Sequence, residues 1–332
     1  MNKLIVEPSP HIKSKNSTNK VMAHVIIAMM PAFGMSAYIF GPRAFLLCIV
    51  CVISCLIFEI LFRRLIRKDK GIDPSPAVTG LLLAFCLPVT MPVYMAVIGC
   101  FIAIVVVKQL FGGLGQNFAN PAITARIALM LSFTAQMTSW AVPFYYKEAD
   151  AVTVAAPLTL DAVTGATPLA LLKAGGQPPG LWDLFMGYHG GCLGETCVAA
   201  LLIGFVYLTF TKIIHPAVPV AFVGTVALGS FAAGLDVGVQ VLSGGLILGA
   251  VFMATDYATS PVTTKGKLIF GIGCGFITLV IRIFAEMPEG VSFAILIMNI
   301  LTVYIDKITV PRAFGAKRAS RLKKAKEGAD NA

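Results

Sequence analysis

The segment DAVTGAT, residues 161–167, offers a reactive hydroxyl group in a chain that otherwise consists largely of long apolar runs. Its last residue, Thr167, follows two small residues and precedes Pro168. A Thr followed by Pro is typical of the N-cap and the first position of a helix. We therefore expect a short helix that starts after Thr167, continues through LALLK and ends at Gly175 and Gly176.

Two roles are open to the Thr167 hydroxyl. It could only cap the helix, which accounts for Thr167 and Pro168 but not for Asp161. It could also accept a phosphate group as an ester. Gly165 and Ala166 leave room beside it for a bulky phosphate, and the N–H groups at a helix start favour a negative charge. The second role explains more of the segment.

A second group of polar residues follows an apolar run in the segment TDYATSP, where Asp256 lies close to Thr259 and Ser260. A carboxylate within a membrane span is a functional candidate by default. Asp256 could coordinate Na⁺ or relay a proton, with the oxygens of Thr259 and Ser260 as further ligands. It could equally pair with Lys265 or Lys267 at the membrane surface, and the sequence does not decide between these roles.

Asn117 and Asn120, in the segment NFANP, precede Pro121. Their amides could bind the ring of a cofactor or cap a broken helix, and the following proline favours capping slightly. Farther along the chain, Arg282 lies only a few residues from Glu286, so an ion pair is the simplest expectation there.

Membrane helices must position these residues. The chain has 332 residues, of which 57% are hydrophobic and 13% are charged, a composition typical of polytopic membrane proteins. The apolar runs are continuous rather than alternating, which favours helices over barrel strands. We predict an all-α protein with about ten transmembrane helices. Six strong segments lie near 21–40, 44–62, 91–111, 194–214, 268–285 and 291–308, and four weaker ones near 75–88, 121–137, 216–233 and 237–254.

The distribution of charge predicts the orientation of these helices. The formal net charge is +10, and 17 of the 26 Lys and Arg residues lie within residues 1–20, 63–70 and 307–326. Basic segments that flank membrane spans are retained in the cytoplasm, whereas a nucleic-acid-binding groove would gather them on one face. We therefore expect no nucleic-acid partner, cytoplasmic termini and an extracytoplasmic loop at 138–193.

Single basic residues give a further test of this orientation. Lys108 and Arg126 are predicted on or near the cytoplasmic side, in agreement with the basic segments. Arg43 is the main exception, because it falls on the outer side. Residues 1–20 contain no apolar signal segment, so the first membrane helix is expected to act as the insertion signal.

Landmarks that recur along the chain indicate a duplication. DPSPAVTGLLLAF and HPAVPVAFVGTVAL are each followed by Gly-Gly-Leu and then by a polar element containing proline, although the spacing differs. Two halves of five helices would be inverted in the membrane, and such repeats place a site near the midplane. The alternative is that membrane helices simply contain more Gly and Pro. The predicted organisation is a cytoplasmic segment 1–20, a first half 21–137, the loop 138–193, a second half 194–308 and a basic tail 309–332.

The motif at 161–167 has the form D-x-x-[ST]-G-A-[ST]. It resembles the site at which a flavin transferase links FMN, through its phosphate, to a threonine hydroxyl. The whole chain resembles the family of Rnf D subunits and of the related B subunits of the Na⁺-pumping NADH:quinone oxidoreductase. Rnf complexes are membrane-bound ferredoxin:NAD oxidoreductases that couple electron flow to Na⁺ or H⁺ transport. The short N-terminal segment favours Rnf, and the resemblance rests on residues 9–32, 112–122, 161–169 and 255–263.

This resemblance implies covalent FMN on Thr167, within a motif that includes Asp161, Thr164, Gly165 and Ala166. A flavin transferase would attach it. The resemblance also implies riboflavin in the same polypeptide. The candidates for a second flavin or ion site are Asn117, Asn120, Asp256, Thr259 and Ser260.

The resemblance further implies two inverted five-helix halves similar to urea-transporter-like channels, in the bacterial inner membrane. The implied partners are membrane lipid and other proteins of the Rnf complex, notably the FMN-bearing G subunit and the A and E membrane subunits. The chain contains no strand followed by G-x-G-x-x-G, so NAD is assigned to another protein of the complex. It also lacks clear iron–sulfur or zinc spacing, and no catalytic residue of its own is predicted.

Other functions stay open at this point. A solute channel or secondary transporter would suit the repeats but would not require the flavin-attachment motif. An assembly protein without a cofactor would leave only the capping role for Thr167. The homologous subunit of the quinone reductase is a further alternative.

Overall fold

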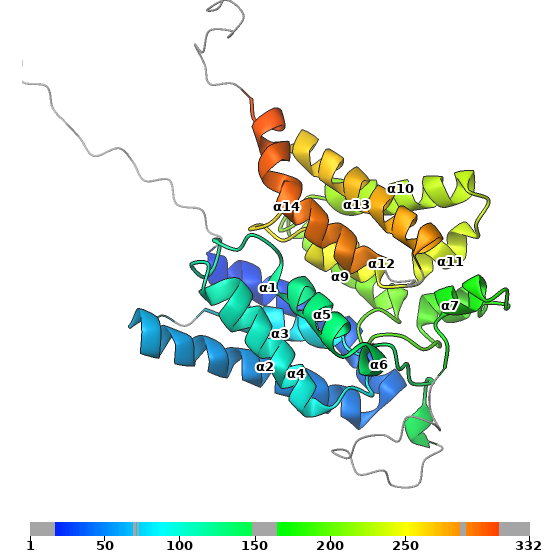
Figure 1. The fold of residues 1–332 in the computed structure, drawn as a ribbon, viewed down its shortest axis with the longest axis horizontal. Helices are drawn as coiled ribbons and strands as arrows, with labels where there is room; N and C mark the ends of the chain where they lie inside the picture. The colour runs from blue at the N-terminus through cyan, green and yellow to red at the C-terminus, as the bar shows by residue number, and fades with distance from the viewer. Residues whose placement is uncertain (1–16, 69–70, 72, 148–164, 286–289, 312–332) are drawn as a thin grey trace, which may run out of the picture.

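The structure is a computed structural model that describes residues 17–68, 71, 73–147, 165–285 and 290–311. Within these ranges the regular structure is helical and contains no β-strand, which confirms the all-α prediction (Figure 1). The longer helices are α1 Thr18–Phe40, α2 Pro42–Phe62, α3 Ser75–Phe85, α4 Val93–Phe101, α5 Pro121–Ser132, α9 Val198–Phe210, α10 Ala217–Ala232, α13 Thr264–Phe284 and α14 Val291–Thr309. The shorter elements are η1 Arg63–Arg67, η2 Ile102–Gln109, α6 Thr134–Met137, η3 Tyr145–Lys147, α7 Pro168–Lys173, α8 Leu181–Met186, α11 Val237–Leu242, α12 Leu246–Leu248 and η5 Gly249–Met253.

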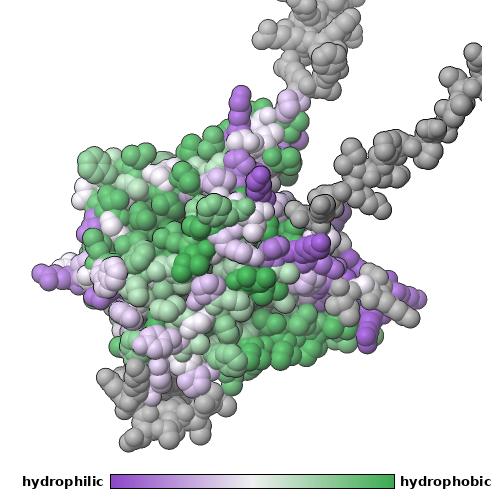
Figure 2. Space-filling model, turned by 180° about the vertical axis from the view of Figure 1, so that it is seen from behind, coloured by the Kyte–Doolittle hydropathy of each residue, from purple (hydrophilic) through white to green (hydrophobic). Residues whose placement is uncertain are grey.

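Several of these helices have the length and composition of membrane spans. Four helical segments of the described chain are long and apolar enough to cross a bilayer: α1, the continuous Pro42–Arg67, α13 and α14. Five further apolar helices are shorter, namely α3, the continuous Val93–Gln109, α5, α9 and α10. Figure 2 shows hydrophobic side chains over most of one face, with hydrophilic side chains concentrated toward its edges. A multi-pass membrane protein therefore fits the structure.

Each of the ten predicted segments contains helix, but three are shorter or more broken than predicted. The segment 194–214 is helical only over α9, because the glycine-rich chain before it is not helical. The segment 121–137 is divided between α5 and α6 at Phe133. The segment 237–254 is interrupted between α11 and α12, where Gly244 and Gly245 adopt φ values of 69° and 65°. Left-handed backbone of this kind favours glycine and stops a helix.

The helices form two bundles that lie side by side (Figure 1). In the first, α2 packs against α3 and α4, and α5 packs against η2 and α3. In the second, α13 packs against α10 and α14, and η5 packs against α10 and α14. The bundles contact each other through α1 with α9 and through α5 with α14.

The sequence landmarks taken as a repeat do not occupy matching helices. Residues 73–85 lead into and include α3, the third apolar helix of the first bundle, whereas residues 215–228 belong to α10, the second helix of the other. Likewise, Gly112–Leu114 follows η2, but Gly244 and Gly245 interrupt a helix. Proline and glycine mark many kinds of helix end, so their order along the chain did not identify equivalent positions.

Two buried arginines hold the chain where helices end inside the protein. After α3, the Arg43 side chain donates to the carbonyl oxygens of Val89 at 2.8 Å and Met91 at 3.3 Å. Between α11 and α12, the Arg282 side chain donates to the carbonyl of Ser243 at 2.9 Å. Carbonyl groups freed by a helix break need such donors in a low-dielectric interior. This burial explains why Arg43 departs from the charge pattern of the loops.

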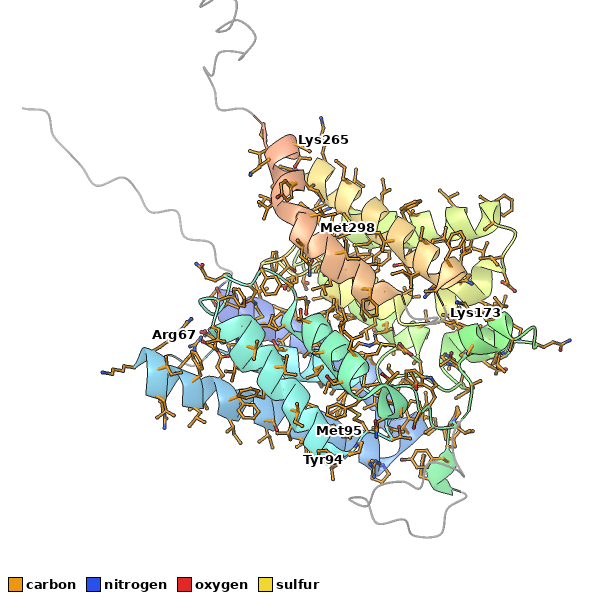
Figure 3. The ribbon with its side chains drawn as sticks, in the orientation of Figure 1. Arg67, Tyr94, Met95, Lys173, Lys265 and Met298 are labelled. Atoms are coloured by element: carbon orange, nitrogen blue, oxygen red, sulfur yellow. The ribbon has the colours of Figure 1, made fainter. Side chains whose placement is uncertain are left out.

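The remaining basic residues differ in their exposure. Arg67 lies at the left of the molecule, Lys265 at the top and Lys173 at the right (Figure 3). Lys108 and Arg126, however, are only 1% and 5% exposed. Both are buried in polar contacts within the protein, so they are not loop residues that report orientation.

Candidate functional site

Thr167 caps helix α7, as the sequence predicts. Its hydroxyl oxygen accepts the N–H of Ala170 at 3.2 Å, and Pro168 occupies the first helical position. The helix ends at Lys173, before Gly175 with a φ of 75°. The Thr167 side chain is buried, whereas the preceding Ala166 is exposed.

The chain before Thr167 is held against the end of the first bundle. The N–H of Gly165 donates to the carbonyl of Trp140 at 2.8 Å, and a Cβ on Gly165 would lie 3.4 Å from the Val142 side chain. Asp161 and Thr164, the other members of the predicted motif, lie outside the described residues. The structure therefore places Gly165, Ala166 and Thr167 together at an ordered turn into α7.

Three of the five residues in the second predicted group border a cavity of about 90 Å³, and Thr259 and Ser260 do not. Asn117, Asn120 and Asp256 all line it, together with residues of α1, α3, α9 and η5. Lys108 and Ser75 are also on its wall. The Asn117 side-chain oxygen is buried and has no hydrogen-bond partner among the described residues.

Asn120 links the two bundles as well as capping a helix. Its side-chain oxygen accepts the N–H of Ala122 at 3.0 Å, which confirms the capping role at the start of α5. Its amide nitrogen donates to the carbonyl of Met253 at 3.3 Å, at the end of η5. With its amide oriented to satisfy both neighbours, Asn299 on α14 accepts from the Asn120 N–H at 3.1 Å and donates to the Thr259 carbonyl at 3.2 Å.

Asp256 is held by its own loop rather than by a lysine. The Thr259 hydroxyl donates to its carboxylate at 3.2 Å, and the backbone N–H of Ser260 donates to its carbonyl at 3.0 Å. Burial raises the pKa of the Asp256 carboxyl, and bonds from the Ala258 N–H and the Thr259 hydroxyl partly oppose this shift. Within the described part of the chain, no ion pair joins Asp256 to Lys265 or Lys267.

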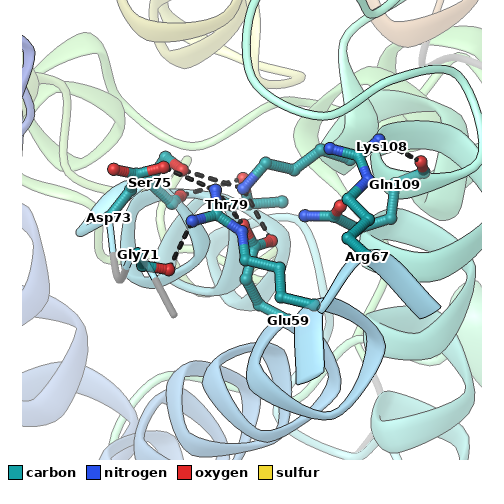
Figure 4. Close-up of polar contacts among 9 residues, drawn as sticks. Glu59, Arg67, Gly71, Asp73, Ser75, Thr79, Lys108 and Gln109 are labelled. Atoms are coloured by element: carbon teal, nitrogen blue, oxygen red, sulfur yellow. Dashed lines mark hydrogen bonds and ion pairs between the residues drawn. The ribbon is translucent and has the colours of Figure 1, made fainter. Parts of the chain in front are cut away.

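A buried network of charges adjoins this cavity (Figure 4). The Lys108 ammonium donates to a Glu59 carboxylate oxygen at 2.8 Å and to the Ser75 hydroxyl at 2.8 Å. The Arg63 guanidinium lies 3.1 Å from the other Glu59 oxygen and 2.5 Å from the Asp73 carboxylate. Two carboxylates thus face two cations. Glu59 is only 2% exposed, so its pairing with Arg63, at the start of the basic segment 63–70, is a buried contact.

The two groups of predicted residues are far apart. Helix α3 begins at the cavity with Ser75 and ends at Phe85, whose carbonyl contacts the chain before α9. Its 11 residues correspond to about 16 Å of helix. The Thr167 turn and the Asp256 cavity are therefore separate sites.

Comparisons with known proteins identify the family. The sequence profile of the NQR2, RnfD, RnfE family matches residues 5–315. The D subunit of the Na(+)-translocating ferredoxin:NAD(+) oxidoreductase complex of Acetobacterium woodii is 46% identical over 97% of this chain and 98% of its own length. The proton-translocating counterpart of Clostridium ljungdahlii is 39% identical over 94% of this chain and 96% of its own. The D subunit of the ion-translocating oxidoreductase complex of Stutzerimonas stutzeri is 38% identical over 91% and 93%.

The chain belongs to the NQR2, RnfD, RnfE family. This confirms the resemblance inferred from the sequence motifs, and the relatives named above are D subunits. The match covers nearly the whole chain, so the two bundles and the loop between them all belong to the family's shared region.

Two features of this NQR2, RnfD, RnfE family member were missed by sequence reasoning. The first is the pairing of Glu59 with Lys108, which are 49 residues apart and carry no local signal. The second is the buried pair of titratable residues His189 and Glu195, in the segment HGGCLGET. A cluster of glycines beside a charged residue in an apolar region was the available signal. The described residues contain no group of three or more His, Cys, Asp or Glu that could hold a metal ion.

Proposed function

We propose that this chain is a membrane subunit of an ion-translocating electron-transport complex of the Rnf type. Support comes from relatives named as D subunits of Na(+)- and proton-translocating ferredoxin:NAD(+) oxidoreductase complexes, each matched over nearly its full length. The chain would act with the FMN-bearing G subunit and the A and E membrane subunits. Both termini would face the cytoplasm of the bacterial inner membrane, and NAD would bind another protein of the complex.

The same proposal places FMN on Thr167 as a phosphate ester. The supporting observation is the position of the Thr167 hydroxyl, at an ordered turn directly after the exposed Ala166. An ester oxygen at this place could still accept the N–H of Ala170 that the hydroxyl accepts now. The residues therefore fit a covalently attached phosphate group.

The chain's own contribution would be to anchor and orient the cofactor. FMN, when bound, supplies one- and two-electron transfer. Thr167 would fix its phosphate at the start of α7. Lys173, at the other end of α7, donates to the carbonyl of Ala285 at the end of α13. This contact holds the short helix against the second bundle and so limits the movement of the attached group.

Flavin fluorescence tests the attachment. Membranes from the native host are denatured, and the band of this protein is examined on a gel for wild type and for Thr167→Val. We expect a fluorescent wild-type band and a dark Thr167→Val band, because valine lacks the hydroxyl. The loss of the N-cap should cost about 1 kcal/mol of stability, so the variant should still insert into the membrane.

Two matched variants sharpen this test. Thr167→Ser keeps the hydroxyl and should remain fluorescent. Thr138→Val removes an exposed hydroxyl near the same end of the first bundle and should also remain fluorescent. A dark wild-type band of the expected mass would reject covalent FMN and would favour a channel or transporter.

We also infer ten spans in two inverted halves, as in urea-transporter-like folds. The helix contacts support this arrangement. The packing of α2 with α4 in the first bundle has a counterpart in α10 with α13, and α3 with α5 has a counterpart in η5 with α14. The contacts between the bundles join helices at equivalent positions: the first long helix of each bundle, α1 with α9, and the last, α5 with α14.

Labelling of single cysteines from either side of the membrane tests the inversion. An impermeant thiol reagent should reach Arg64→Cys and Lys265→Cys from the cytoplasm and Gln177→Cys from the outside, since all three positions are exposed. The eight native cysteines are buried and should not react. Labelling of Gln177→Cys from the cytoplasm would contradict the inverted arrangement.

A second candidate site is the cavity bordered by Asn117, Asn120 and Asp256, proposed for an ion or for one edge of riboflavin, since about 90 Å³ is too small for the whole molecule. The Asn117 oxygen, which has no partner among the described residues, supports a polar ligand there. Thr259 and Ser260 would act by holding the Asp256 loop. We expect purified Asn117→Leu protein to lose non-covalent flavin and to retain the fluorescence of the flavin attached to Thr167. Unchanged non-covalent flavin would reject the site.

A further inference from the structure

Glu195 is a buried carboxylate with one oxygen left without a partner. It lies in the segment between α8 and α9 and is only 4% exposed. One carboxylate oxygen, Oε1, accepts the N–H of Cys192 at 2.9 Å. The other, Oε2, has no hydrogen-bond partner among the described residues. An ionised carboxylate in this state is costly in a low-dielectric interior.

Two neighbouring side chains are also unsatisfied. The Thr196 hydroxyl is 1% exposed and has no partner within the described ranges. His189 is 5% exposed; its Nδ1 lies 3.0 Å from the carbonyl of Gly190, and its Nε2 has no partner in the same ranges. Most buried polar groups in proteins are hydrogen-bonded, so three exceptions within eight residues require an explanation.

Glycines surround the carboxylate. A Cβ on Gly245 would lie 2.7 Å from Glu195 Oε2, and a Cβ on Gly191 would lie 2.9 Å from Oε1. Gly245 also has a φ of 65°, which other residues rarely adopt. The turn at Gly245 in the second bundle can approach the carboxylate only because Gly245 has no side chain.

The segment is fixed in the interior by the end of α3. The N–H of Leu193 donates to the carbonyl of Leu87 at 3.0 Å, and the N–H of Gly194 donates to that of Phe85 at 3.0 Å. A Cβ on Gly194 would come within 2.3 Å of the Phe85 side chain. The carboxylate therefore lies where a broken helix of the first bundle meets the glycine turn of the second.

The charged groups around Glu195 come from three elements. Arg126 on α5 donates to the Cys192 sulfur at 3.3 Å and to the Ser292 hydroxyl at 3.1 Å. Arg282 on α13 donates to the carbonyls of the turn that contains Gly245. His189 faces Glu195 from the same segment. Burial lowers the pKa of its imidazole, and the backbone of Gly190, the Glu195 carboxylate and the backbone of Thr196 partly oppose this shift. A neutral imidazole would not repel a cation.

We propose that Glu195, with the Thr196 hydroxyl as a second oxygen ligand, binds a monovalent cation, either a proton or Na⁺. A single carboxylate balances a single positive charge, and carboxylate and hydroxyl oxygens are hard ligands that suit Na⁺. The binding would remove the unpaired charge from the interior. The choice of cation rests on the ion-translocating part of the proposed function, but the site does not depend on FMN at Thr167.

Infrared difference spectroscopy of the purified complete complex tests this site. Spectra are recorded in NaCl and in choline chloride over a series of pH values, and the C=O stretch of a protonated carboxyl group is followed. We expect a carboxyl band in wild type that is absent in the isosteric Glu195→Gln variant. A band abolished by Na⁺ identifies Na⁺ as the cation, and a band that responds only to pH identifies the proton.

Two outcomes would overturn the proposal. One is identical spectra for wild type and Glu195→Gln under all conditions. The other is a cation-dependent band that survives in Glu195→Gln and disappears in Asp256→Asn. The infrared measurement requires no electron flow, so it is independent of the test of Thr167. A dark gel band would reject covalent FMN and would not affect the infrared result.

A pair of threonine variants tests the second ligand. If Na⁺ binds, Thr196→Val should shift the Na⁺ concentration at the midpoint of the change in the carboxyl band at least tenfold. If the proton binds, Thr196→Val should shift the midpoint pH of that change by a measurable amount. Thr278→Val is the matched control, since Thr278 is also buried and its hydroxyl also has no partner within the described residues, but it lies on α13. Equal midpoints for Thr196→Val and Thr278→Val would remove Thr196 from the site.

Discussion

Glu59 and Glu195 are both buried carboxylates of this protein, but they differ in their partners. Glu59 meets Lys108 at 2.8 Å and Arg63 at 3.1 Å, and the same network adds Asp73 as a second acid. Glu195 accepts one backbone N–H and, within the described residues, forms no ion pair. The first carboxylate is neutralised by the fold itself, whereas the second is left available.

The difference separates a structural role from a binding role. Paired charges that satisfy one another hold α2, η2 and the start of α3 in one arrangement, and removing one partner leaves an uncompensated charge. An unsatisfied carboxylate weakens the fold unless something else binds to it. The free energy that the protein gives up at Glu195 is therefore available to a ligand.

The largest predicted effect is at the paired network. Lys108→Met should lower the free energy of unfolding by on the order of 3 kcal/mol, because Glu59 loses its closest cation in a buried site. The midpoint of thermal unfolding of the full-length protein in detergent measures this. Lys265→Met, which removes an exposed lysine, is the matched control and should change stability by less than about 0.5 kcal/mol.

A double variant separates charge pairing from packing at this network. Glu59→Gln combined with Lys108→Met should recover part of the loss caused by Lys108→Met alone, because no acid is then left unpaired. Additive losses of unfolding free energy in the double variant would show that Lys108 stabilises the protein by packing. The contrast between a charge-paired Glu59 and an unpaired Glu195 would then be wrong.

A smaller effect is expected from the pH dependence of the unpaired region. Burial lowers the pKa of His189 in the folded protein, so the unfolded chain binds its proton at a higher pH. Neutral His189 therefore contributes stability above about pH 6.5, the usual pKa of histidine. As the pH falls below this value the contribution is lost, by at most about 1.4 kcal/mol of unfolding free energy per pH unit. Thermal midpoints from pH 7.5 to 5 should fall less steeply in His189→Gln than in wild type. Parallel curves would mean that His189 is not buried in its neutral form.

The smallest effect is expected at Glu195 itself. Glu195→Gln should change the free energy of unfolding by less than about 1 kcal/mol and could raise it, because the amide removes an unpaired charge while keeping the shape. The comparison with Lys108→Met is made in the same detergent and at low Na⁺. A loss as large as that of Lys108→Met would show that Glu195 has a structural partner, and the distinction between the two carboxylates would be wrong.

Much of the site at Thr167 was predictable because its signals are local. A helix cap depends on the residue before the helix and on the N–H groups directly after it, so Thr167, Pro168 and Gly175 could be interpreted from a stretch of about ten residues. The same holds for Asn120 at the start of α5. Apolar runs also located helix in all ten predicted segments, since burial in lipid requires a continuous apolar surface.

Other predictions concern long-range questions, which local sequence does not answer. Lys108 and Arg126 were expected on or near the cytoplasmic side; the structure shows each of them buried against a partner elsewhere in the fold, and their side of the membrane stays a prediction. The recurring Pro and Gly landmarks did not mark equivalent helices, because many different helix ends use the same residues. Asp161 and Thr164, the remaining motif residues, lie outside the described residues, so their roles stay predictions.

Local sequence was thus sufficient to locate the apolar helices and the caps at Thr167 and Asn120. Only the tertiary structure decided which buried charges are satisfied. Glu59 finds Lys108 across 49 residues, and Arg126 finds Cys192 across 66. Such pairings depend on how helices pack in three dimensions. A carboxylate oxygen without a partner among the described residues, such as Oε2 of Glu195, can be recognised only after its neighbours have been placed.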